Sequence, residues 1–297
     1  RRGGGLGTVH KTTVDDTPID VVVLATGVNR IPLSPGDKPG NKALIPFHGK
    51  SSLCRVLDAL DAVPELGRIC VEGPVEQLGQ EIAKRTGLRQ VDLIEGGETF
   101  VESLVRGLEH FRSAKRVLFV NADLPLLTPA AVDAFLDAMP AEDPDHIGRL
   151  FVSAVPEPAF RGLYARPTKP FNGYRGMRIC HGNIFAVDPG LLDLPGLRKR
   201  IDALYRGRKN AVTSTLALGL DIALVYMLGV ELFHWISLPE MARYVSRRYG
   251  FGIVPVVLPW PELTEDVDEP DDYTFVETVL EKRQVQEERK HAACVSK

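Results

Sequence analysis

The chain has 297 residues, and Lys plus Arg total 36 against 39 for Asp plus Glu, giving a formal net charge of −3. Hydrophobic residues at 44% and charged residues at 25% are ordinary globular values, which argue against disorder over most of the chain. No positive excess remains for a nucleic-acid footprint, so we expect no nucleic-acid partner. The four cysteines form no Cys-x-x-Cys pair, which favours reduced thiols over a disulfide frame or a zinc site.

The two ends of the chain differ in composition from the rest. Residues 1–18 combine a glycine run with polar residues and lack an apolar stretch, so we expect a disordered arm and no signal peptide. With the reduced cysteines, this favours a cytoplasmic protein. Residues 282–297 are mostly charged, and we expect a tail in which the last helix frays. A single domain is expected over residues 19–281.

Strand and helix patterns alternate through the first half. Val21 to Leu24 is a continuous apolar run, typical of a strand buried on both faces. A helix with one apolar face begins at Ser51. Further strands are predicted at 69–71, 91–94 and 117–120, and helices at 75–82, at 101–111 and from Pro129. Such alternation predicts an α/β fold with helices on both sides of a mostly parallel sheet, and ligands of such sheets lie beyond the carboxyl ends of the strands.

The second half is less regular. A polar connection at 160–178 is long enough to be a binding loop. Residues Ser237 to Glu240 form a capping box that opens a helix reaching Tyr249. The other predicted elements are strands at 151–155, 179–187 and 253–258, a helix at 191–206 and a last helix from Pro270.

The segment 211–236 is strongly apolar and long enough to span a membrane. Asp221 lies in its middle and Glu231 near its end, and one central charge costs about 2.5–3.5 kcal/mol on insertion scales. We therefore favour a helix pair packed on the sheet edge. Peripheral membrane contact and a homodimer face through this segment are the alternatives.

Three stretches at strand ends contain residues suited to chemistry. A loop with Gly27 and Arg30, followed by Lys42, suits a triphosphate cradle, although Gly27 alone indicates only a turn and Lys42 only a surface lysine. Asp123 directly follows a buried strand, where a Mg²⁺ ligand would lie, or where an aspartate would cap a turn. Asp266 and Asp268 point to opposite sides if extended, so only one can face the same metal; helix-capping acidity is the alternative.

The order and context of these motifs resemble the nucleotidyltransferases of the nucleotide-diphospho-sugar transferase superfamily, close to the molybdenum-cofactor guanylyltransferase-like (MobA-like) NTP transferases. The family's opening loop is matched by Leu-Ala-Thr-Gly-Val-Asn-Arg at 24–30 and by Lys-Ala-Leu-Ile-Pro-Phe-His-Gly-Lys at 42–50. Its strand-end motif is matched by Asp-Leu-Pro-Leu-Leu-Thr-Pro at 123–129, and its closing motif by Asp-Val-Asp-Glu-Pro-Asp-Asp at 266–272. Gly96, Gly97 and Ser103 are similar to a stretch that lies against the base in related cytidylyltransferases.

The resemblance implies a Rossmann-like three-layer α/β/α fold of the nucleotide-diphospho-sugar transferase (GT-A-like) type, with a mostly parallel mixed sheet. It divides the domain into a nucleotide-binding half, 19–150, and an acceptor-binding half, 151–281. It further implies Mg²⁺-dependent transfer of NMP from an NTP, CTP or GTP, to a small phosphorylated acceptor, with release of pyrophosphate.

The resemblance also assigns roles to residues. Asp123 and Asp268 would bind Mg²⁺, and Arg30 and Lys42 would join Asp123 in catalysis. The nucleotide-binding residues would be Leu24, Ala25, Thr26, Gly27, Asn29, Gly96, Gly97 and Ser103. Candidates for the acceptor are Lys169, Arg175, Asn183 and Lys209, the alternatives being surface cations and, for Asn183, a turn residue.

Two departures and three alternatives accompany this assignment. The first loop is one residue shorter than the family's between Gly27 and Arg30 and lacks its second glycine. The segment from Ile31 to Asn41 is longer and richer in Pro and Gly than the family's. A glycosyltransferase on the same fold would place its Asp-x-Asp pair mid-chain, whereas here the pair is near the end. A non-catalytic nucleotide-binding protein would not need both metal carboxylates. A dinucleotide-binding oxidoreductase is disfavoured because no Gly-x-Gly-x-x-Gly follows the first strand.

Overall fold

The computed structural model describes residues 17–33, 40–86, 89–140, 148–166, 169–196, 199 and 220–295. Several predictions fall outside these residues, wholly or in part. Among them are the arm over residues 1–16, most of the predicted helix at 191–206, the acceptor candidate Lys209 and the 211–219 portion of the apolar segment.

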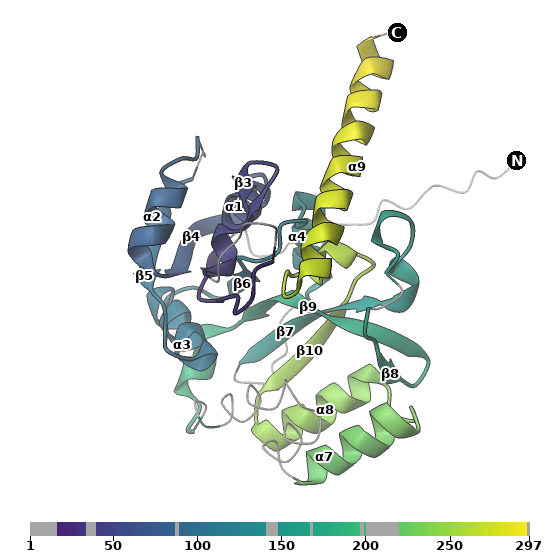
Figure 1. Ribbon diagram of the computed structural model, residues 1–297. Helices are drawn as coiled ribbons and strands as arrows, with labels where there is room; N and C mark the ends of the chain where they lie inside the picture. Colours follow the sequence, from purple (N-terminus) through teal and green to yellow (C-terminus); the bar gives the residue numbers. More distant parts are fainter. Residues whose placement is uncertain are drawn as a thin grey trace, which may run out of the picture.

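The core of the fold is a mixed sheet in which β9 runs antiparallel to its neighbours (Figure 1). The pairs β1–β4, β1–β6, β4–β5 and β7–β10 are parallel. The strand order is β10 (Gly252–Val257), β7 (Arg149–Pro156), β9 (Met177–Val187), β6 (Val117–Asn121), β1 (Ile19–Leu24), β4 (Leu66–Gly73) and β5 (Val91–Glu95). A short β8 (Asn172–Tyr174) pairs with β9, and β2 (Pro46–Phe47) pairs with β3 (Lys50–Ser51).

Helices cover both faces of this sheet. On β1, Val21 and Val23 belong to one apolar cluster and Val22 and Leu24 to another, because successive side chains point to opposite faces. The first cluster contains residues of α1 (Ser52–Asp61), α2 (Val75–Ile82) and α4 (Pro129–Ala138). The second contains residues of α3 (Phe100–His110), α7 (Leu220–Tyr226) and α8 (Leu238–Tyr249). The predicted Rossmann-like three-layer α/β/α arrangement with a mostly parallel mixed sheet is confirmed.

Side-chain caps set the helix starts that the sequence predicts. Ser51 accepts a hydrogen bond from Cys54 N, and Thr128 accepts one from Ala131 N ahead of Pro129. The capping box of Ser237 and Glu240 is present at α8, which ends at Gly250 in the left-handed conformation. These caps satisfy backbone N–H groups that the first helical turn leaves free.

The long helix α9 (Pro270–Val295) begins beside the sheet and projects away from it, so that its C-terminal end stands clear of the other elements (Figure 1). Val276, Val279 and Leu280 form a third apolar cluster with residues from the loops that follow β1 and β6, including Leu33 and Leu126. The helix continues without a break through residues 282–295, which the sequence predicts as a fraying tail. Packing of α9 therefore fixes loops that lie beside two strand ends.

The predicted helix at 191–206 is wrong at its start. The chain forms a 3₁₀ helix at Pro189–Asp193 and then a turn, in which Gly196 has a φ of +72°. Pro195 cannot donate a backbone hydrogen bond, and a left-handed Gly196 turns the chain away, so no α-helix passes through this point.

The described part of the apolar segment forms α7 and then a π-helix at Met227–Leu232. No helix in the described part of the chain is long and apolar enough to cross a membrane. Met227, Leu232, Phe233 and Trp235 are nevertheless 49–61% exposed. Membrane contact or a homodimer face through this segment stays a prediction.

Candidate active site

Backbone hydrogen bonds bring two predicted loop motifs together at the end of β1. Ala25 N donates to Glu72 O on β4 at 2.8 Å, which extends the parallel pairing past Leu24. Lys42 N then donates to Gly27 O at 2.9 Å. The side chain of Lys42 lies over Gly27, because a Cβ added there would come 3.5 Å from Lys42 Cδ. Lys42 is thereby held at the carboxyl edge of the sheet.

Two asparagines fix this loop. Asn29 is 3% exposed; its Oδ1 accepts from Gly40 N at 2.7 Å and its Nδ2 donates to Ile31 O at 3.0 Å. Asn41 Nδ2 donates to Ala25 O at 2.6 Å. The side chain of Asn29, predicted to bind nucleotide, therefore shapes the loop, and we assign it that positioning role.

A charged cluster stands at the centre of this edge. Lys42 Nζ donates a hydrogen bond to Asp268 Oδ1 and lies 3.6 Å from Asp123 Oδ2. The Lys42 and Asp123 side chains are 12% and 16% exposed, whereas that of Asp268 is 64% exposed. Burial lowers the pKa of Lys42, but the Asp123 and Asp268 carboxylates outweigh it and raise that pKa overall. Three residues that the sequence predicts as a site are thus in contact.

The carboxylates of this cluster destabilise one another. Burial raises the pKa of Asp123, with a further increase from Asp268, although Lys42 opposes both. Burial together with Asp123 and Asp268 raises the pKa of Asp266 to about 7. Asp266 is therefore close enough to Asp123 and Asp268 to interact with them electrostatically. That only one of Asp266 and Asp268 faces a metal stays a prediction.

The donor set suits a hard divalent cation held jointly with a phosphate. Asp123 Oδ1 is buried and has no hydrogen-bond partner among the described residues. Within the same part of the chain, no three His, Cys, Asp or Glu side chains converge to hold a metal by themselves. Mg²⁺ typically takes only one or two carboxylates and completes its shell with water and substrate phosphates, so the residues present fit it.

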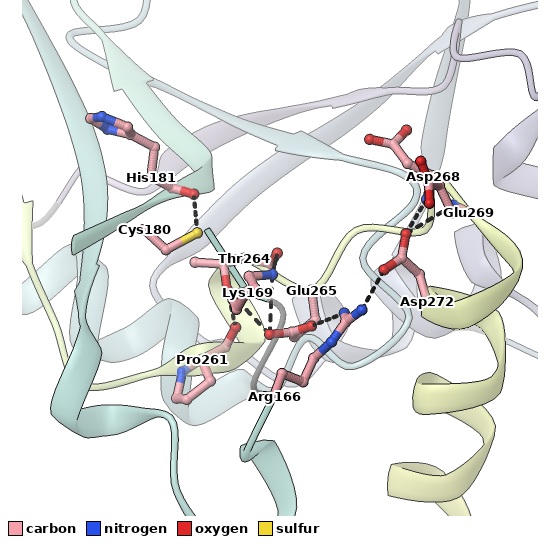
Figure 2. Close-up of polar contacts among 10 residues, drawn as sticks. All are labelled: Arg166, Lys169, Cys180, His181, Pro261, Thr264, Glu265, Asp268, Glu269 and Asp272. Atoms are coloured by element: carbon pink, nitrogen blue, oxygen red, sulfur yellow. Dashed lines mark hydrogen bonds and ion pairs between the residues drawn. The ribbon is translucent and has the colours of Figure 1, made fainter. Parts of the chain in front are cut away.

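A buried ion network supports the loop that leads to Asp268 and α9 (Figure 2). Glu265 is fully buried; its Oε2 accepts from Arg166 Nη1 at 3.1 Å and its Oε1 lies 3.2 Å from Lys169 Nζ. Lys169 Nζ also donates to Thr264 O at 2.7 Å. A buried carboxylate requires such partners, so Arg166 and Lys169 fix the chain immediately before the site.

Arg166 extends this network to the start of α9. Its Nη2 donates to Asp272 Oδ1 at 2.8 Å. Asp272 Oδ2 accepts from Asp268 N at 3.0 Å and from Glu269 N at 2.8 Å (Figure 2). This positioning role of Arg166 and Asp272 was not predicted, and the one sequence signal for it is the acidic run at 265–272 that leads into α9.

The predicted acceptor residues lie in different environments. Asn183 on β9 is close to the β6 end, since Asn121 Nδ2 donates to its Oδ1 at 3.4 Å. The Lys169 ammonium donates a hydrogen bond to Thr264 O and forms an ion pair with Glu265. Arg175 lies in the β8–β9 turn and donates to Glu240 Oε1 of α8 at 2.7 Å and to Trp235 O at 3.2 Å. Lys169 and Arg175 thus have partners within the chain, and their role toward an acceptor stays a prediction.

The predicted base-binding residues meet the same edge from β4 and β5. Gly96 N donates to Gly73 O at 3.3 Å, and Gly97 N donates to Ser103 Oγ at 3.1 Å. A Cβ on Gly96 would collide with Thr26 Cγ2, so only glycine permits this approach. Arg30, at the far side of the first loop, is exposed.

This geometry agrees with the comparison to known proteins. The sequence profile of the MobA-like NTP transferase domain matches residues 21–169, half of the chain. The chain belongs to this family. As a MobA-like NTP transferase it is a nucleotidyltransferase, and the matched residues contain the β1 loop, Lys42 and Asp123.

Solved structures with the same fold extend the similarity beyond the matched half. A hypothetical transferase from Thermus thermophilus is 26% identical, with a TM-score of 0.67 over 86% of this chain and 99% of that chain. A 4-diphosphocytidyl-2C-methyl-D-erythritol synthase from Anaerococcus prevotii is 12% identical, with a TM-score of 0.52 over 90% and 97%. A CMP:2-keto-3-deoxy-manno-octonic acid synthetase is 14% identical, with a TM-score of 0.52 over 90% and 99%. No curated protein matches the chain.

Proposed function

We propose that this NTP transferase moves NMP from CTP or GTP to a small phosphorylated acceptor in a Mg²⁺-dependent reaction that releases pyrophosphate. One observation carries the proposal: Lys42 and the carboxylates of Asp123 and Asp268 are in contact at the carboxyl edge of the sheet. Cations and metal-binding carboxylates side by side are what transfer between phosphates requires.

Asp123 and Asp268 are the residues that would hold Mg²⁺, because Asp123 Oδ1 lacks a partner and Asp268 is the more exposed carboxylate. When bound there, Mg²⁺ supplies Lewis-acid polarisation and a template for the phosphates. The positively charged Lys42 ammonium lies between the two carboxylates and pairs with both. It would turn toward the phosphates when the nucleotide binds.

The remaining steps belong to this chain's own side chains and backbone. The loop from Leu24 to Gly27 would hold the nucleotide, with Gly96, Gly97 and Ser103 on the base side. An acceptor phosphate oxygen would form a bond to the α-phosphorus while the bond from that phosphorus to the α–β bridging oxygen breaks. Lys42 and Arg30 would neutralise charge on the departing pyrophosphate. A phosphate acceptor is already ionised at neutral pH, so this reaction needs no general base.

CTP is the first donor to test. Two solved structures with this fold are named for cytidyl or CMP products, and one of them is complexed with CTP. GTP follows from the family resemblance to the molybdenum-cofactor guanylyltransferases. Among acceptor candidates, Asn183 is the one best situated near the β6 end, where Asn121 contacts it.

The function is tested by thermal unfolding with CTP, GTP, ATP and UTP, each with Mg²⁺ and with EDTA. A ligand at a hundredfold its Kd adds about 2.7 kcal/mol of stability, so we expect a clear rise in Tm for one triphosphate that EDTA removes. That triphosphate is then assayed for pyrophosphate release with a panel of phosphorylated sugars and alcohols.

Two other outcomes would replace the proposal. A rise in Tm with a nucleotide sugar but with no triphosphate would favour a glycosyltransferase. A triphosphate that binds equally well in Mg²⁺ and EDTA and gives no pyrophosphate with any acceptor would favour a non-catalytic nucleotide-binding protein.

A further inference from the structure

A buried carboxyl group that the mechanism does not use lies at the end of β4. Glu72 is 0% exposed, and no ion pair joins it to a cation within the described residues. The strand before it, Ile69 to Val71, is apolar and fully buried. Burial of a carboxylate without an ion pair disfavours its charged form. A glutamate at this position therefore lowers the stability of the fold unless it has a function.

The one described backbone partner of this carboxyl belongs to the predicted base-binding segment. Glu72 Oε1 accepts a hydrogen bond from Gly97 N at 3.2 Å. Burial raises the pKa of Glu72. Ser103, Gly97 and the positive charge of Arg106 lower that pKa, but burial outweighs them. Glu72 Oε2 is buried without a partner among the described residues. Gly97 N is shared between Glu72 and Ser103 Oγ, which lies at 3.1 Å.

The Gly96–Gly97 segment packs tightly against the loop that follows β1, so the positions of the two segments depend on each other. A Cβ on Gly97 would come 2.6 Å from Ser103 N, and one on Gly96 would collide with Thr26 Cγ2. Gly96 N also donates to Gly73 O, directly after Glu72. A shift of Gly97 therefore moves backbone that touches Thr26, a residue predicted to bind nucleotide.

We propose that Glu72 is a positioning residue for the nucleotide base, which holds the Gly96–Gly97 segment against the β1 loop through its bond to Gly97 N–H. This inference rests on the proposed function. A glutamine would fit the same space without a buried charge, but a carboxylate accepts hydrogen bonds about twice as strong. A buried carboxylate that lowers stability and lies beside a predicted ligand-binding edge is typical of a functional site.

The test measures equilibrium binding by calorimetry at pH 8.5 for CTP and GTP with Mg²⁺, and for inorganic pyrophosphate, which has no base. Glu72→Gln is expected to raise the Kd of the triphosphate that binds by about tenfold, the effect of one weakened hydrogen bond of about 1.4 kcal/mol. The Kd of pyrophosphate should not change. Glu95→Gln is the matched control, because it removes the same charge from an exposed side chain at the end of neighbouring β5.

Two further readouts separate positioning from general loss of structure. Burial raises the pKa of Glu72 to about 7, so the difference in Kd between wild type and Glu72→Gln should shrink as the pH falls from 8.5 to 6. The Tm of Glu72→Gln at pH 8.5 should equal or exceed that of wild type, because the variant removes a buried charge. Ser103→Ala, which removes the second acceptor of Gly97 N–H, should also weaken triphosphate binding and serves if Glu72→Gln does not fold.

The inference is overturned if wild type and both variants bind the triphosphate equally, or if pyrophosphate binding weakens as much as triphosphate binding. A wild-type protein that binds no triphosphate would instead refute the proposed function, and the inference with it. The two failures are therefore distinguishable.

Discussion

Asp123 carries a buried carboxylate oxygen without a partner, and we expect it to be needed for metal-dependent nucleotide binding. Asp123→Asn should reduce Mg²⁺-dependent pyrophosphate release by roughly a hundredfold or more, because a neutral amide cannot balance the cation. Asp133→Asn is the matched control: Asp133 on α4 also has a raised pKa and an unpartnered buried oxygen, but lies outside the site. Comparable losses in both variants would remove Asp123 from the mechanism.

Asp266 gives a prediction about pH. Burial, Asp123 and Asp268 raise its pKa from 3.8 to about 7. A folded-state pKa above the unfolded one means that stability is lost as the pH rises from about 4 to about 7. Asp266→Asn should therefore raise Tm in thermal unfolding, and by more at pH 8 than at pH 5. A gain in Tm that does not depend on pH would contradict this reading.

At the scale of elements, the segment before α9 depends on the buried network around Glu265. Arg166→Leu should destabilise the fold by about 3 kcal/mol in urea unfolding, since among the described residues it leaves buried Glu265 with Lys169 as its one cation and the Thr264 hydroxyl as a neutral donor. Arg178→Ala breaks the exposed Arg178–Glu157 pair and should cost less than about 1 kcal/mol. Equal losses in the two variants would mean that burial of the network adds nothing.

The same variant should change catalysis, because Asp272, held by Arg166, accepts hydrogen bonds from the backbone of Asp268 and Glu269. Segments that are far apart in sequence thus place Asp268, a proposed metal ligand: the loop at Arg166 after the 3₁₀ helix Gly162–Tyr164, the loop at Glu265 and the first turn of α9. Such positioning explains why the acidic run at 265–272 forms a site as well as a helix start.

At the scale of the whole molecule, α9 fastens the strand-end loops but extends far beyond them (Figure 1). Residues 284–289 are all exposed, including Val285 at 41%, whereas Val276, Val279 and Leu280 are buried. Deleting residues 286–297 should therefore change the free energy of unfolding by less than about 1 kcal/mol, while Leu280→Ala should cost about 2–5 kcal/mol. Denaturant unfolding of both proteins checks this, and a large loss on truncation would assign the end of α9 a packing role.

The sequence alone determined most of the fold. Apolar strand runs, one-sided helices and capping residues such as Ser51, Thr128 and Ser237 act over a few neighbouring residues, so their signals are local and readable. The order of motifs also indicated that Lys42, Asp123 and Asp268 meet, because parallel strands bring their carboxyl ends to one edge. Pro195 and Gly196 are a local helix-breaking signal as well, and the prediction of a helix at 191–206 did not take them into account.

Tertiary structure decided what each charged side chain does. Lys169 and Arg175 have the same sequence signal as substrate-binding cations, yet buried Glu265 and the α8 residue Glu240 occupy them. Asp266 interacts with Asp123, and Glu72 is buried against Gly97, only because distant segments close around them. Burial and ion pairing depend on partners that are distant in sequence, 226 residues apart for Lys42 and Asp268, and no local pattern encodes those partners. Local sequence therefore determined where the site lies, and packing decided which of its groups are free to act.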